Sequence, residues 1–282
     1  MITEVGKLYI VATPIGNMKD ITYRAVEVLN DVDIIAAEDT RNTIKILNHY
    51  NIKTKLVSYH EHNKYDKANI IVKYLKEGLD VALVTDAGTP IISDPGYELV
   101  KLCYDEMIEV TSIPGPSAII NAIVLSGLSS NEFSFYGFLP IKQKERKIKL
   151  EEIKNDNKLI VLYISPHKLI NDLTDIKKYI AENRKIVLLK EMTKIYEKRL
   201  SGSIDEIIDI CSGQEIKGEF VLLISKDDKI HIDDEILKLN KMTIKEHFNY
   251  YINNGFDDKV AMKMVAKDRN LDKREVYKII KI

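Results

Sequence analysis

The chain has 282 residues, of which 45% are hydrophobic and 30% are charged, a balance typical of proteins with a buried core. This length predicts about two domains. No run of about 18 apolar residues occurs, which argues against a transmembrane helix, and the N-terminus lacks a secretory pattern. The two cysteines, Cys103 and Cys211, lie far apart, so a cysteine metal site and a disulfide scaffold are excluded and a cytoplasmic protein is expected.

The charge is unevenly distributed. The net charge of −1 taken alone disfavours nucleic acid as a partner. Residues 142–149, however, hold five basic residues and one acid, and residues 259–282 hold eight basic residues and three acids. These two basic islands predict a phosphate-facing surface, although solvated lysine-rich faces are the alternative.

The first half of the chain alternates short apolar runs with amphipathic stretches of helical spacing. Strands are predicted at residues 8–12, 33–37, 56–59, 81–85, 108–111 and 133–138. Helices are predicted at residues 21–29, 64–77, 95–105 and 117–126. Asp94 followed by Pro95 is typical of a helix N-cap and first position. The alternation predicts a mainly parallel α/β sheet covered on both faces.

The second half predicts another α/β domain and a helical tail. Residues 140–149 are polar, basic and aperiodic, which favours a linker between domains at residues 1–139 and 150–228. The second domain has predicted strands at 159–164, 185–190 and 220–224 and helices at 168–180 and 204–210. Residues 241–282 predict a basic helix-turn-helix-like tail, with helices at 258–267 and 272–280. Its predicted apolar stripe consists of Val260, Met264, Val265, Leu271, Val276 and Ile279.

Four loops at the expected carboxyl ends of strands are rich in glycine, proline and small polar residues. They cover residues 12–17, 85–96, 113–118 and 163–167. In an open α/β sheet ligands bind at this edge, where glycine permits close approach of the backbone and proline restricts the loop. Any one of these loops could be an ordinary turn, but the four together predict a small-molecule cleft.

The loop sequences restrict the class of ligand. The chain contains neither G-x-G-x-x-G after the first strand nor G-x-x-x-x-G-K-[ST], which argues against dinucleotide and P-loop nucleotide sites. Residues 85–95 contain no lysine or arginine but include Asp86 and Asp94. This loop favours a neutral or cationic ligand, such as a sulfonium.

Several long motifs resemble one known family. The segments LYIVATPIGN (8–17), AEDTR (37–41), SYHEH (58–62), TDAGTPIISDPG (85–96) and PGPS (114–117) resemble the 16S ribosomal RNA cytidine-2′-O-methyltransferases of the tetrapyrrole-methylase superfamily. The resemblance extends from about residue 7 to residue 224. In the fourth loop, the family usually has an acidic residue after the tyrosine, where this chain has Ile164. Whether Ile164 replaces a functional acid is left open.

The resemblance implies a homodimeric enzyme with two α/β domains and a small helical tail. It implies that S-adenosyl-L-methionine binds between the domains and that the ribose of a cytidine in the decoding centre of 16S rRNA is methylated. The cofactor contacts implied by matching motifs are Ile15, Ala87, Gly88, Thr89, Ile92, Ser117, Ala118, Ile164 and Met192. The expected partner is 16S rRNA or the 30S subunit, and no association with a membrane is expected.

Methyl transfer to a ribose hydroxyl needs positioning of donor and acceptor and benefits from a proton acceptor. The candidate acceptors are Glu38, Asp39, His60 and Glu61, and the sequence does not choose among them. Asp39 is also a candidate N-cap for a helix beginning near Thr40. No metal is expected, because His60 and His62 lack a third ligand at a standard spacing.

RNA binding is predicted for Arg41 and for the two basic islands, through phosphate contacts. The island residues are Lys142, Lys144, Arg146, Lys147, Lys263, Lys267, Arg269, Lys273 and Arg274. Two alternatives are a C-methyltransferase for a corrin or sirohaem precursor and a non-catalytic RNA-binding protein. The basic tail disfavours the first alternative, and the intact glycine loops disfavour the second.

Overall fold

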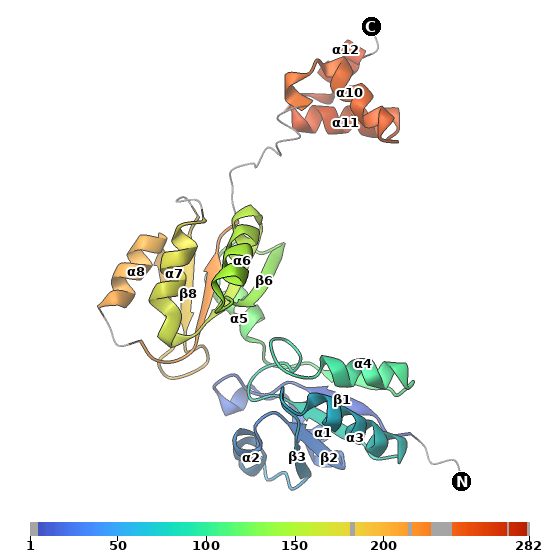
Figure 1. Cartoon of the computed structure of the whole chain (residues 1–282), viewed down its shortest axis with the longest axis vertical. Coiled ribbons are helices and arrows are strands. Elements are labelled where there is room, and N and C mark those ends of the chain that lie inside the picture. The colour runs from blue at the N-terminus through green and yellow to red at the C-terminus, as the bar shows by residue number, and fades with distance from the viewer. Residues whose placement is uncertain (1–4, 181–183, 214–215, 227–238, 270, 281–282) are drawn as a thin grey trace. The chain divides into compact units, whose positions relative to one another are not determined.

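The computed structural model describes residues 5–180, 184–213, 216–226, 239–269 and 271–280 (Figure 1). The chain forms two compact units, residues 1–227 and residues 228–282. In the described residues, the first unit contains two five-stranded sheets, and the second is helical. None of the described helices has the length and apolar character needed to cross a membrane.

The first sheet is parallel throughout, with strand order β3-β2-β4-β1-β5. Its strands are β1 (Leu8–Val11), β2 (Ile34–Ala37), β3 (Lys55–Ser58), β4 (Val81–Val84) and β5 (Val110–Ile113). Its helices are η1 (Met18–Asp20), α1 (Tyr23–Asp31), α2 (Thr40–His49), α3 (Lys64–Lys76) and α4 (Tyr97–Asp105). Leu75 and Leu99 of α3 and α4 pack against one face, and Leu29 and Leu47 of α1 and α2 pack against the other. The predicted parallel sheet, covered on both faces, is confirmed.

The second sheet is mixed, with strand order β6-β7-β10-β8-β9, in which β6 and β7 are parallel and the other neighbours are antiparallel. Its strands are β6 (Phe133–Phe138), β7 (Leu159–Ile164), β8 (Ile186–Lys190), β9 (Lys198–Gly202) and β10 (Phe220–Ile224). Its helices are α5 (Ala118–Ser126), α6 (Gln143–Asn155), η2 (Pro166–Lys168), α7 (Leu169–Lys177) and α8 (Ile204–Ser212). Strand β9 was not predicted, because it is a short and largely polar edge strand.

The predicted domain boundary at residue 139 is wrong. Strand β6 pairs with β7, and Ile119 and Ile123 of α5 pack with Leu189 in the core of the second sheet. The chain therefore passes to the second sheet between Ile113 and Ala118. Strand pairing is non-local, so the sequence pattern identified β6 as a strand without indicating the sheet to which it belongs.

The predicted linker at residues 140–149 is also wrong for most of its length. Residues 143–149 form the first half of α6, whose Leu150 and Ile153 are buried in the core of the second sheet. The helical period was hidden because a charged residue, Arg146, occupies a buried position on the same face.

The C-terminal unit includes α10 (Ile244–Asn253), α11 (Asp258–Asp268) and α12 (Lys273–Ile280), of which α10 was not predicted. Its core includes Leu239, Tyr251 and Val265. The predicted apolar stripe is partly wrong, because Val260, Leu271 and Ile279 are exposed while Ala261 and Met262 are buried. Some predicted positions lie outside the described residues. They are the end of the predicted second domain (227–228), residue 270 between the two predicted tail helices, and the end of the tail (281–282).

Candidate functional site

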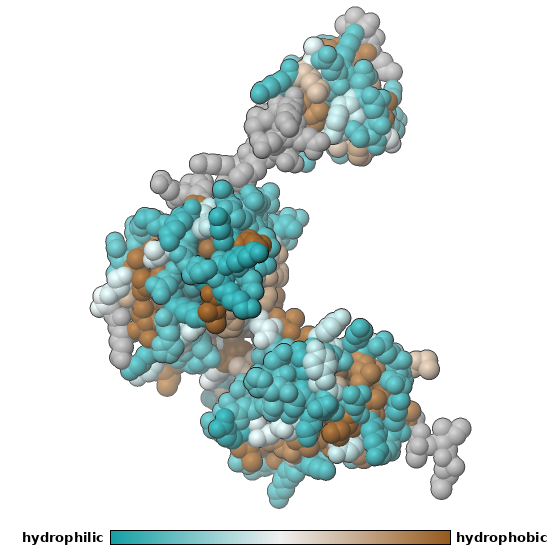
Figure 2. All heavy atoms as spheres, in the orientation of Figure 1, coloured by the Kyte–Doolittle hydropathy of each residue, from teal (hydrophilic) through white to brown (hydrophobic). Residues whose placement is uncertain are grey.

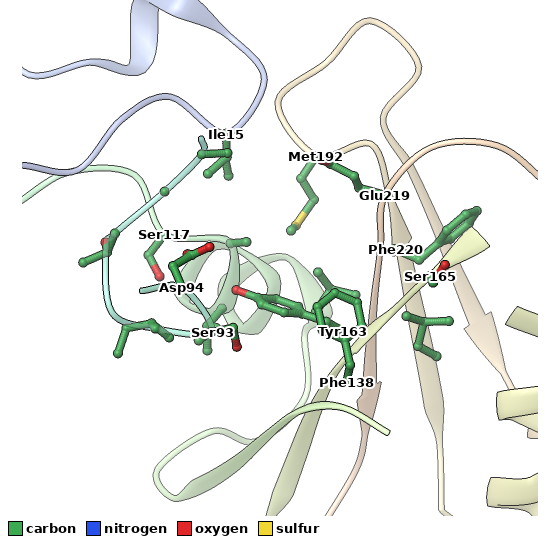
Figure 3. A pocket seen from close by; sticks show the side chains of 18 of the residues that line it. Ile15, Ser93, Asp94, Ser117, Phe138, Tyr163, Ser165, Met192, Glu219 and Phe220 are labelled. Carbon is green, nitrogen blue, oxygen red and sulfur yellow. The ribbon is translucent and has the colours of Figure 1, made fainter. Parts of the chain in front are cut away.

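A cavity of about 370 Å³ lies within the first unit, at the carboxyl ends of β1 and β4 and beside β7 and β10 (Figure 3). The cavity is lined by Ile15, Ala87, Gly88, Thr89, Ile92, Ser93, Asp94, Ser117, Ala118, Ile119, Phe138, Tyr163, Ile164, Ser165, Pro166, Met192, Glu219, Phe220 and Val221. All nine residues predicted to contact the cofactor lie in this wall. The structure therefore brings four separate sequence loops to one site.

Backbone and side-chain hydrogen bonds join three of these loops. Thr13 and Gly88 exchange backbone hydrogen bonds of 2.9 and 3.0 Å, and the Thr89 hydroxyl donates to the Pro116 carbonyl at 3.2 Å. Gly88 has a φ of 82°, a conformation that favours glycine. Gly88 therefore contributes backbone atoms and no side chain to the cavity wall.

The second sheet supplies the apolar and aromatic part of the wall. The rings of Phe138 and Tyr163 lie 5.5 Å apart. Ile164 pairs with Phe220 in the β7–β10 ladder and is 3% exposed. An acid at this position would lose most of its solvation, so Ile164 contributes apolar surface to the cavity.

Met192 lies on a backbone segment with an unusual conformation. The residues on either side, Glu191 and Thr193, have φ values of 52° and 67°. Such conformations cost free energy in residues other than glycine and concentrate at ligand sites. The segment presents Met192 toward the cavity, on the side of Ile15 (Figure 3).

The lining fits a ligand that is partly apolar and partly cationic. Its volume lies within the usual range for small-molecule sites, and its charged lining residues are Asp94 and Glu219, with no lysine or arginine among the described residues that line it. A sulfonium ion suits carboxylates and carbonyl oxygens as neighbours, and an adenine ring suits the aromatic and aliphatic wall.

Two of the predicted proton acceptors lie near one another beside the cavity, but neither lines it. Glu38 accepts a 2.7 Å hydrogen bond from the Thr85 hydroxyl. Asp39 caps α2 through the backbone N–H of Arg41 and forms an ion pair with its guanidinium at 2.6 Å. These hydrogen bonds from Arg41 lower the pKa of Asp39 to about 2, which makes Asp39 a weak proton acceptor.

The other two predicted acceptors have local contacts. His60 receives an Asn63 contact at its ring nitrogen Nε2, 3.1 Å away, and Glu61 forms an ion pair with Lys64 at 2.7 Å. Neither lines the cavity. Among the described residues, no group of three or more His, Cys, Asp or Glu side chains could hold a metal ion.

Two of the residues predicted to bind RNA make polar contacts within their own units. Arg146 is 6% exposed and forms ion pairs with Asp172 and Asp175 at 2.7 and 2.8 Å, so its guanidinium does not face solvent. Arg269 donates hydrogen bonds to the ring of His247 and to the Leu239 carbonyl within the C-terminal unit. The prediction of RNA contact is wrong for Arg146, because this cation is buried within its own unit. For the half-buried Arg269 it stays a prediction.

The other predicted RNA contacts are exposed. Three of them lie at the start of α6, over which hydrophilic side chains gather in Figure 2. These exposed cations are Arg41, Lys142, Lys144, Lys147, Lys263, Lys267, Lys273 and Arg274. Arg41 is exposed even though it pairs with Asp39.

The sequence gives Asp94 two interpretations, a carboxylate in a ligand-binding loop and a helix N-cap. Helix α4 begins at Tyr97, with Gly96 rather than Asp94 as its N-cap, and Asp94 lines the cavity. The N-cap prediction is wrong, and Asp94 keeps its place in the glycine-rich loop. Phe138 was missed, because aromatic residues in strands usually belong to the core, whereas Tyr163 belongs to the fourth predicted loop.

Comparison with known proteins agrees with this architecture. The sequence model of the tetrapyrrole (corrin/porphyrin) methylases matches residues 7–208. Cobalt precorrin-4 methyltransferase, a cobalamin biosynthetic enzyme of known structure, superposes with a TM-score of 0.59 at 16% identity, covering 78% of this chain and 94% of that chain. The fold and site thus define a methyltransferase of the tetrapyrrole-methylase fold.

Relatives with higher sequence identity indicate the group within this family to which the chain belongs. The ribosomal RNA small subunit methyltransferase I of Halalkalibacterium halodurans is 45% identical, covering 97% of this chain and 94% of the relative. The protein of the same name from Bacillus subtilis is 43% identical, covering 98% and 94%. The chain belongs to the tetrapyrrole (corrin/porphyrin) methylase family and, within it, to the ribosomal RNA small subunit methyltransferase I group.

Proposed function

We propose that this protein transfers a methyl group from S-adenosyl-L-methionine to the ribose 2′-hydroxyl of a cytidine in the decoding centre of 16S rRNA. The observation that carries the proposal is the convergence of nine motif residues on one cavity, in a chain similar over nearly its whole length to ribosomal RNA small subunit methyltransferases. The reaction takes place in the cytoplasm, on 16S rRNA or the 30S subunit.

Different cavity residues would bind the adenosine group and the methionine group of the cofactor. Ile164, Met192 and Phe220 provide an apolar wall for the adenosine group, while the carbonyl-rich loop around Gly88 suits the methionine group and its sulfonium. When bound, the cofactor supplies an activated methyl group. The protein contributes the position of the acceptor hydroxyl relative to that methyl group and the exclusion of water.

The exposed cations of α6 and the C-terminal unit would contact RNA phosphates. Lys142, Lys144 and Lys147 are close in sequence on one element, and Lys263, Lys267, Lys273 and Arg274 are exposed in the second unit. Such contacts position a substrate without reading its sequence and weaken with salt. A small tetrapyrrole would not need a second unit with this charge.

A homodimer is proposed on the outer face of α5. Ile120, Val124 and Leu125 are exposed there, while Ile119 and Ile123 of the same helix pack inward. Exposed apolar residues grouped on one helix mark association surfaces. Sedimentation velocity of Val124→Glu should show monomers where the wild type is a dimer, and a wild-type monomer would refute the dimer.

Transfer of label tests the function. Radiolabelled S-adenosyl-L-methionine is incubated with the protein and 30S subunits, naked 16S rRNA or uroporphyrinogen, and the labelled atom is located. The proposal expects label on a ribose of 16S rRNA. Label on uroporphyrinogen would support the tetrapyrrole enzyme instead, and RNA binding without transfer would support the non-catalytic alternative.

A further inference from the structure

A carboxyl group projects into the cavity from the loop that follows β4. Asp94 and Tyr163 both point into this space (Figure 3). The Thr85 hydroxyl donates a hydrogen bond to Glu38 Oε2, and both side chains are close enough to Asp94 to influence its pKa. Glu38 and Thr85 directly follow the adjacent strands β2 and β4. Asp94 is therefore the member of this set that meets a ligand.

The loop holds Asp94 in a fixed place. Ser93 and Ile91 have φ values of 69° and 79°, and Pro95 and Gly96 are buried behind Asp94. A Cβ on Gly96 would lie 2.7 Å from Ile91 Cγ1, which shows how closely the loop folds on itself. A tightly packed loop positions a side chain more accurately than an open one.

The surroundings make Asp94 a stronger base than an ordinary carboxylate. Burial raises the pKa of Asp94 to about 6. The negative charge of Glu38 adds to this effect, Asp86 contributes in the same direction, and the nearby Thr85 hydroxyl opposes it. From the second sheet, Tyr163 faces Asp94, and burial, with the charge of Asp94, raises the pKa of its hydroxyl to about 12. Asp94 is therefore ionised at neutral pH and has an affinity for protons suited to general base catalysis.

We propose that Asp94 accepts the proton of the substrate hydroxyl during methyl transfer and that Glu38 is a positioning residue for Asp94; this rests on the proposed function. The ribose oxygen forms a bond to the methyl carbon as the carbon–sulfur bond breaks, its electron pair stays on sulfur, and the hydroxyl proton goes to Asp94. The sulfonium charge is lost and the carboxylate charge is neutralised, so charge and atoms balance.

The other carboxylates near the cavity do not meet the same conditions. Glu219 lines the cavity, but it forms an ion pair with Lys194 at 2.9 Å. Asp39 is paired with Arg41, and Glu61 with Lys64. Among the described carboxylates, Asp94 combines a place in the cavity wall with an environment that raises its pKa.

Single-turnover rates against pH test the assignment. The variants are Asp94→Asn and Glu38→Gln, with Asp105→Asn at the exposed end of α4 as the matched control. The wild-type rate should fall below about pH 6. Asp94→Asn should be slower by about 10²–10⁴-fold and lose this acidic limb. Glu38→Gln should lose less rate and move the limb to lower pH, a shift that a merely structural role would not produce.

A second measurement needs no reaction. Carboxyl ¹³C NMR of the protein alone should show a carboxyl group titrating near pH 6, absent in Asp94→Asn, shifted to lower pH in Glu38→Gln and unchanged in Asp105→Asn. The single-turnover rates above are measured at saturating S-adenosyl-L-methionine, so that they report the role of a base in the transition state and not cofactor binding.

The outcomes separate this assignment from the function on which it rests. A wild-type protein that methylates no RNA would overturn the proposed function and the assignment with it. An active wild type whose Asp94→Asn variant keeps a rate within about tenfold, or keeps the acidic limb, would overturn the assignment alone.

Discussion

Thr13 and Gly88 exchange two backbone hydrogen bonds, 2.9 and 3.0 Å long, which join the loop after β1 to the loop after β4. The bridge closes the wall of the cavity on one side. It also places the Gly88 backbone where a side chain would lie near Ile15.

Replacing Gly88 by alanine should weaken cofactor binding and lower stability. At a φ of 82°, an added Cβ costs roughly 1–2 kcal/mol, and it would lie 3.4 Å from Ile15 Cγ2. Thermal unfolding and calorimetric titration with S-adenosyl-L-methionine measure the two effects. The control is Gly213→Ala, where φ is −92° and nothing lies within 4 Å of the new Cβ. Equal behaviour of the two variants would remove Gly88 from the site.

Replacing Arg146 by alanine should destabilise the first unit. The change leaves the buried Asp172 without its ion-pair partner, and breaking such a pair costs about 3–5 kcal/mol. Denaturant unfolding measures this loss. The neighbouring Lys147 is exposed, so Lys147→Ala should leave stability unchanged and lower the log–log salt slope of RNA binding by roughly 0.7–0.9. A stable Arg146→Ala protein with a reduced slope would reverse the assignment.

Asp94→Asn should stabilise the fold at neutral pH. The pKa of Asp94 is raised from 3.8 to about 6 in the folded state, so the folded protein binds more protons than the unfolded chain between these values. Protonated Asp94 therefore contributes to the free energy of unfolding. This contribution is fully present below pH 4 and is lost as the pH rises through 6. Because Asp94 is partly accessible, the gain for asparagine at pH 7.5 should be on the order of 1 kcal/mol. Thermal unfolding at pH 4 and 7.5 should show a gain only at the higher pH; equal gains at both would contradict the pKa.

Removing residues 228–282 should weaken RNA binding while cofactor affinity stays near that of the wild type, because this unit is compact by itself. If Lys263, Lys267, Lys273 and Arg274 each contact a phosphate, the salt slope should fall by roughly 3. Replacing these four residues by glutamine in the full chain is the matched control. A slope that changes in neither protein would mean that these cations are only solvated surface.

Much of the fold could be predicted from sequence because its signals are local. The apolar runs of β1, β4 and β7 and the helical spacing of α3 lie within single elements, where the periods of strand and helix differ. The predictions failed where the signal was weak or non-local. Helix α6 has a buried arginine on its apolar face, and the partner of β6 is set by pairing across the fold.

The same distinction between local and non-local signals applies to the candidate site. Glycine and proline in the four loops, together with the long motifs, predicted from sequence alone which residues line the cavity, because backbone conformation depends on local chemistry. Only the tertiary structure decided the roles of the charged residues. Arg146 binds Asp172, Asp39 binds Arg41, and Asp94 turns toward the cavity beside Glu38. The charge and proton affinity of an ionisable group depend on its solvation and on the charges around it, and folding brings those neighbours from distant parts of the chain.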